Sequence, residues 1–89
     1  MSEKEKADEE IVIQRINQLL GLKRGFRAGT RRTAGLRARL NEHGLGTVME
    51  VLAFVWDKWE GWERRSDYFQ PDTLFRPSNF ERYEEDMAI

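Results

Sequence analysis

The segment TVMEVLAFVWDKWE, residues 47–60, decides the fold class of this chain. Its apolar residues recur with the period of an α-helix, and Thr47 followed by Glu50 matches the T-x-x-E pattern that caps a helix N-terminus. The apolar stripe consists of Val48, Val51, Leu52, Val55, Trp56 and Trp59. The sequence therefore predicts a long amphipathic helix that ends near Glu60 or Gly61.

Two further helices are predicted on the N-terminal side of this segment. The first runs from about Asp8 to Leu20, because acidic residues stand at its start, apolar residues follow at helical spacing, and a glycine comes next. The second runs from Thr30, as its N-cap, to His43. It contains Gly35, which costs about 1 kcal/mol relative to alanine inside a helix. A packing reason is therefore expected there, such as the close approach of another helix.

Aromatic residues and two prolines dominate the sequence after residue 61. Half of the ten aromatic side chains lie between Tyr68 and Tyr83. We expect this segment to lie across a helical core, with a single helical turn near residues 72–75 and a last short helix near residues 79–85. The prediction is an all-α fold: a small domain of three to four helices, with an aromatic, proline-containing C-terminal segment packed over the core. Its predicted parts are a frayed lead-in at 1–7, a single helical domain at 8–85 and a tail at 86–89.

The composition excludes several classes of protein. Cysteine is absent, which excludes a disulfide scaffold, a cysteine-ligated zinc module and a cysteine nucleophile. The single histidine, His43, has no catalytic or metal-binding partner in the sequence, and no phosphate-loop motif occurs. We therefore expect a binding protein with no catalytic residues, no bound metal and no cofactor, rather than an enzyme. The longest apolar run, at residues 51–56, is too short to span a membrane, so no membrane contact is expected.

Charge is distributed unevenly along the chain, although the net charge is −1. Residues 1–40 have a balance of +5 and residues 41–89 a balance of −6, and no acidic residue occurs between Ile11 and Asn41. Residues 21–30 contain three glycines and no helical period, which predicts a basic loop that leads into the second helix. Arginine side chains and helix N-terminal amides both bind phosphate, so this region predicts weak, sequence-tolerant and salt-dependent nucleic-acid binding. The predicted contact residues are Lys23, Arg24, Arg27, Arg31, Arg32, Arg37 and Arg39.

Each of these features has an alternative interpretation. The basic segment can instead pair with the acidic half of the same domain, and the sequence leaves these two interpretations open. The aromatic half supports another function, a protein-interaction module that binds a host or phage partner or self-associates. Its predicted partner-binding residues are Trp62, Tyr68 and Phe69. Trp56, Trp59 and Trp62 follow one another at intervals of three residues, which fits a stacking platform for bases less well than a packed helix face. Trp62, past the helix end, is expected to be the most exposed of the three.

Several pieces of the sequence, taken in order, resemble the conserved phage C-terminal domain family. They begin with Ile16, Asn17 and two leucines, followed by Gly-Phe-Arg at 25–27 and RARLNEHG at 37–44. The most specific piece, YFQPDTLF at 68–75, is similar to the family's Y-L-x-P-x-T-L-F, and a matching F-x-x-Y follows at 80–83. The similarity covers roughly residues 11–84, with only about ten residues before it.

The resemblance implies a biological setting and no catalytic residues. Domains of this family stand at the ends of phage replication proteins, including replisome-organiser and helicase-loader-like proteins with a winged-helix N-terminal domain. We therefore expect either a module of a longer protein or a small stand-alone phage or prophage protein, in the cytoplasm of the bacterial host. The partners that this implies are DNA and a replicative helicase or another replication protein.

Overall fold

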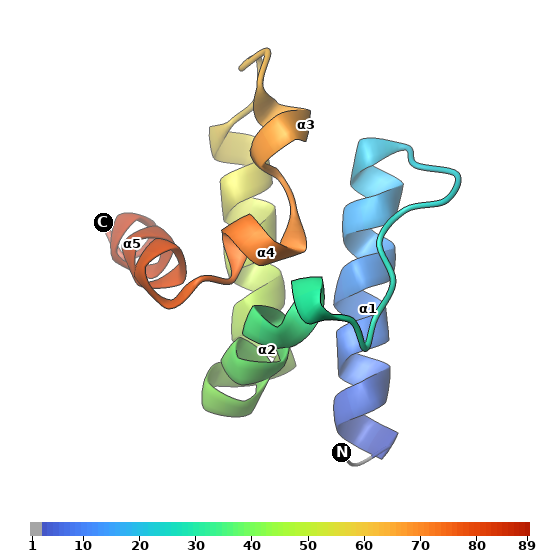
Figure 1. Ribbon diagram of the computed structural model, residues 1–89. Coiled ribbons are helices and arrows are strands. Elements are labelled where there is room, and N and C mark those ends of the chain that lie inside the picture. The colour runs from blue at the N-terminus through green and yellow to red at the C-terminus, as the bar shows by residue number, and fades with distance from the viewer. Residues whose placement is uncertain (1–2) are drawn as a thin grey trace.

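A computed structural model describes residues 3–89 of the chain. The regular elements of these residues are all helical: α1 (Glu3–Leu20), the 3-10 turn η1 (Arg31–Thr33), α2 (Ala34–Lys58), α3 (Arg65–Tyr68), α4 (Pro71–Leu74) and α5 (Pro77–Met87). Figure 1 shows α2 between α1 and α5, and α2 contacts both of them. The all-α fold predicted from the sequence is confirmed.

α1 begins earlier than the sequence pattern predicts. The helix starts at Glu3 rather than near Asp8, so residues 3–7, which the sequence analysis assigned to a frayed lead-in, are helical in the structure. The first two residues of that lead-in lie outside the described residues. Two glutamates in the first turn favour the early start, because carboxylates there face the positive end of the helix dipole.

α2 contains both of the helices predicted over residues 30–60, joined at a break. Gly44 adopts φ 84° and ψ 165° at this point, a conformation outside the helical region that glycine reaches without strain. Helical residues resume directly after it, so Thr47 lies inside the helix and is not the predicted N-cap. Figure 1 shows the chain changing direction here, so that the residues after the break lie beside α1.

The core forms where α1, α2 and the aromatic C-terminal segment meet. Its buried side chains are Val12, Ile13, Ile16, Leu36, Leu40, Val48, Val51, Leu52, Val55, Phe69, Leu74, Phe75 and Phe80. Three phenylalanines of the C-terminal segment are the largest side chains with under 2% of their surface exposed. The predicted packing of this segment over the helical core is therefore confirmed.

The C-terminal segment contains more helix than the sequence predicts. α4 and α5 each begin with a proline, which suits the first helical position because its missing N–H has no partner inside the helix. The single turn of α3 was not predicted. α5 continues to Met87, so the predicted tail at 86–89 is reduced to the two residues that follow it.

Gly35 faces the backbone that follows α4. A β-carbon built on Gly35 would lie 2.8 Å from the carbonyl oxygen of Phe75 and 3.2 Å from its carbonyl carbon. The close approach expected from the sequence is therefore present, but the approaching segment is the end of a single turn rather than a long helix.

Replacing Gly35 with alanine should destabilise the protein by about 1–2 kcal/mol. The Phe75 backbone would have to move, and overpacking of this kind costs about 1–3 kcal/mol, more than the gain of up to about 1 kcal/mol in helix propensity. Gly46→Ala is the matched control in the same helix, because nothing lies within 4 Å of its added β-carbon. In urea unfolding, the free energy of unfolding of Gly46→Ala should be equal to or higher than that of wild type. A Gly35→Ala variant as stable as the control would contradict the packing argument.

Candidate nucleic-acid interface

The loop at residues 21–30 runs back along α1 and is fastened to it at two points (Figure 1). At the first point, Asn17 donates its side-chain amide to the carbonyl oxygen of Phe26 (3.0 Å) and accepts the Phe26 N–H (2.8 Å). Gly25 makes this approach possible, because a β-carbon there would collide with the Asn17 side chain. The Phe26 ring packs against the core.

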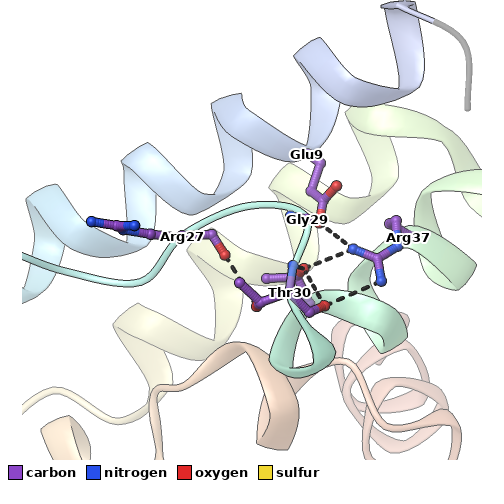
Figure 2. A network of polar contacts seen from close by, with 6 residues as sticks. Glu9, Arg27, Gly29, Thr30 and Arg37 are labelled. Carbon is purple, nitrogen blue, oxygen red and sulfur yellow. Dashed lines mark hydrogen bonds and ion pairs between the residues drawn. The ribbon is translucent and has the colours of Figure 1, made fainter.

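The second fastening point is a buried carboxylate on α1 (Figure 2). The side chain of Glu9 is fully buried, and its Oε1 accepts the Gly29 N–H (2.9 Å) and one Arg37 N–H (2.8 Å). Within residues 3–89, its other oxygen, Oε2, has no hydrogen-bond partner. Arg37 also donates to the hydroxyl of Thr33 (2.9 Å) and to the carbonyl oxygen of Thr30 (3.1 Å). One carboxylate and one guanidinium thus join α1, the loop and the start of α2.

Three of the seven predicted nucleic-acid contacts form ion pairs within the protein, which makes them less available to a ligand. Arg37 is held in the network just described. Arg39 is only 7% exposed and pairs with Glu42 at 3.0 Å, because its position on α2 turns it toward the core. Arg32 donates to Gln70 (2.9 Å) and lies 3.6 Å from Asp72, so it joins η1 to α4 although it is half-exposed.

The other four predicted cations lie on the surface of the loop and of η1. Lys23, Arg24, Arg27 and Arg31 are all exposed, and none of them makes an ion pair with any part of the chain that the structure describes. The stretch of α1 beside the loop, residues 11–20, contains no acidic residue. Four exposed cations therefore remain after internal pairing is taken into account, and three of them, Lys23, Arg24 and Arg27, line one surface hollow with Asn17.

The three residues predicted to bind a partner protein lie in two different environments. Trp62 is 41% exposed and Tyr68 is 39% exposed, and their rings stack with centroids 5.2 Å apart. Phe69 is fully buried and packs against Trp56, with ring centroids 4.9 Å apart, so its predicted role in partner binding is wrong. Tyr68 ends the short α3 turn and Phe69 follows it, and one is exposed while the other is buried, which the sequence alone does not reveal.

Sequence analysis missed the two residues that hold the basic loop in place, Glu9 and Asn17. Each stands on a helix among other polar residues, and neither position carries a local signal that its side chain turns inward. For Asn17 the only available sign was its place in the family-like pattern before the Gly-Phe-Arg segment. The Asn17–Phe26 contact joins residues that are 9 positions apart in the chain, and the Glu9–Gly29 contact joins residues that are 20 positions apart.

Other features of the described residues bear on the chemistry of the surface. Burial raises the pKa of the Tyr83 hydroxyl above its ordinary value, while nearby Arg82 acts in the opposite direction, so Tyr83 is neutral near pH 7.

Residues 3–89 contain no group of three or more histidine or acidic side chains placed to hold a metal ion. No helix among them is both long and apolar enough to cross a lipid bilayer.

Comparison with known proteins places the chain in a family. A family model described as conserved phage C-terminus matches residues 12–85. Comparisons with curated proteins and with solved structures gave no match. The matched range includes Asn17, the basic loop and the aromatic C-terminal segment, whereas Glu9 lies before it.

Proposed function

Because the chain belongs to the conserved phage C-terminus family, we propose that it is a non-enzymatic accessory module of phage DNA replication that binds nucleic acid. Domains that it resembles stand at the ends of phage replication proteins, which supports this setting. The observation that carries the proposal is a set of four exposed cations without ion pairs on the fastened loop and the η1 turn that follows it: Lys23, Arg24, Arg27 and Arg31.

The geometry favours contact with phosphates over recognition of base sequence. Arginine and lysine side chains on a loop reach phosphate oxygens without entering a groove, and such contacts position a protein without specifying sequence. The two fastening points hold the loop backbone before a ligand arrives, so less conformational freedom is lost on binding. With about four phosphate contacts, the logarithm of affinity should fall with the logarithm of salt concentration with a slope of about −3 to −4.

Reversing two loop charges should weaken nucleic-acid binding at least about tenfold at low salt and reduce the magnitude of the salt slope by about 2. Lys23→Glu/Arg24→Glu is the suitable variant, because neither side chain makes an ion pair within the described residues. Arg32 is unsuitable, since its reversal would also break the contacts to Gln70 and Asp72. Fluorescence anisotropy with labelled single- and double-stranded DNA, at low and at moderate salt, measures both quantities.

A second double variant separates a local effect from a change in net charge. Lys6→Glu/Arg82→Glu changes the net charge by the same amount at two exposed positions outside the loop. It should bind almost as tightly as wild type at moderate salt. Equal losses in the two variants, or no binding by folded wild-type protein at low salt, would contradict the proposed function.

A protein-interaction module is the second candidate function, favoured by the exposed and stacked pair Trp62 and Tyr68. The partner under this proposal is a replicative helicase or another replication protein. An apolar interface persists at salt concentrations that dissociate phosphate contacts. A pull-down with the helicase that is insensitive to salt and lost in Trp62→Ala would support this candidate over the first.

A further inference from the structure

We propose that the ligand of this surface is single-stranded nucleic acid, with its phosphates along the loop and η1, residues 21–33, and a base stacked on Trp62. The inference rests on the proposed function and adds the class of nucleic acid to it. Proteins that bind single strands without sequence preference combine a positive track for the backbone with aromatic rings for the bases. Both parts are present in this domain.

The basic loop and the aromatic pair are joined by a short chain of contacts. The Arg32 guanidinium lies 5.0 Å from the centroid of the Phe26 ring and donates to Gln70 at 2.9 Å. The backbone N–H of Gln70 in turn donates to the carbonyl oxygen of Tyr68 at 2.9 Å. Arg32 and Gln70 therefore link the basic segment to the exposed rings, in a domain with principal extents of 37 × 32 × 19 Å.

The Trp62 ring is held in place and still offers a free surface. Tyr68 lies nearly parallel to it, at 17°, and the Trp59 ring stands at 72° to it with centroids 5.3 Å apart. The Arg64 guanidinium lies 5.5 Å from the centroid of the Tyr68 ring and continues the stack. Because 41% of the Trp62 surface stays exposed beside these two contacts, a base can stack on the exposed part of the ring.

Charge determines which part of a strand meets each part of the surface. Glu60 and Glu63 are exposed on either side of Trp62 in the sequence and disfavour a phosphate there. The nearby Arg64 is paired with Asp67 at 3.7 Å. The loop offers only cations, so the phosphates lie on the loop and a base reaches the tryptophan. In a duplex the bases are stacked inside the helix and their faces are unavailable, which predicts a preference for single strands.

Binding to three probes of matched length tests this arrangement. They are a labelled oligothymidylate of about twelve nucleotides, an abasic strand with the same phosphates, and a duplex of that length. Wild-type protein should bind the oligothymidylate at least about 5-fold more tightly than the abasic strand, since stacking contributes roughly that much or more per base. In Trp62→Ala this difference should disappear, while binding to the abasic strand stays unchanged.

Two more variants serve as controls for a loss of structure in Trp62→Ala. Trp62→Phe keeps a ring for stacking and should retain most of the preference for the oligothymidylate. Ile11→Ala removes an apolar side chain of similar exposure, 44%, and should leave the preference intact. Melting temperatures equal to that of wild type establish that each variant is folded.

The outcomes separate the inference from the function on which it rests. Salt-sensitive binding that is equal for all three probes, or equal losses in Trp62→Ala on the oligothymidylate and the abasic strand, would overturn the inference and leave phosphate binding standing. Absence of binding to every probe at low salt would overturn both. A Trp62→Ala variant that binds all probes like wild type but no longer binds a helicase would assign the ring to a protein partner instead.

Discussion

Replacing Phe69 with alanine should lower the free energy of unfolding by about 3–5 kcal/mol, the loss expected when a fully buried phenylalanine leaves a cavity. The side chain is 0% exposed and packs against Trp56 on α2 and against Trp59, the residue that follows α2. Domains of this size are stable by only about 5–15 kcal/mol, so the variant should melt about 12 °C or more below wild type. Thermal unfolding followed by circular dichroism measures the shift.

Tyr68→Ala is the matched control, because it removes the neighbouring aromatic side chain on the exposed side of α3. Tyr68 is 39% exposed and contacts mainly Trp62 and Arg64, so its loss should cost about 1 kcal/mol or less. Similar stability of the two variants would show that Phe69 is not part of the core. A stable Phe69→Ala protein that loses only partner binding would restore the role predicted from the sequence.

Replacing Glu9 with alanine should destabilise the protein by about 2–4 kcal/mol and release the basic loop. The substitution removes the acceptor of the Gly29 N–H and leaves Arg37 without its carboxylate partner. The Arg37 side chain is 30% exposed, so water can compensate for part of the loss, and the effect should be smaller than for a fully buried pair. Urea unfolding measures the stability, and hydrogen exchange of the Gly29 amide reports directly on the loop.

Glu10→Ala supplies the control for Glu9, since the adjacent carboxylate is exposed and its removal should change stability by about 0.5 kcal/mol or less. Arg37→Met completes a double-mutant cycle, and the two losses should be strongly non-additive because both act on one network. Additive losses, or a Glu9→Ala variant as stable as Glu10→Ala, would show that the carboxylate does not hold the loop.

The fold class could be predicted from the sequence because the periodicity of apolar residues depends only on residues close together in the chain. The apolar positions of residues 48–59 repeat with the helical period and line the core side of α2. Gly21 and Gly44, which take positive φ angles, were both predicted as helix ends. The start of α1 and the turn of α3 were not predicted, because neither carries an apolar stripe and both depend on charge placement or on neighbouring segments.

The candidate surface could be predicted only in part from the sequence, for a related reason. Sequence alone determined that residues 23–39 are rich in cations without a local acidic partner, and that Trp62 is the most exposed tryptophan. It could not separate Arg37 and Arg39 from Lys23 and Arg24, because side-chain direction on a helix depends on what packs against it. Glu9 and Arg37 stand 28 positions apart and meet only in the folded chain. The spacing of apolar residues along the chain therefore determined where helices form. Only the tertiary structure determined which charged side chains form ion pairs inside the protein and which stay exposed for a ligand.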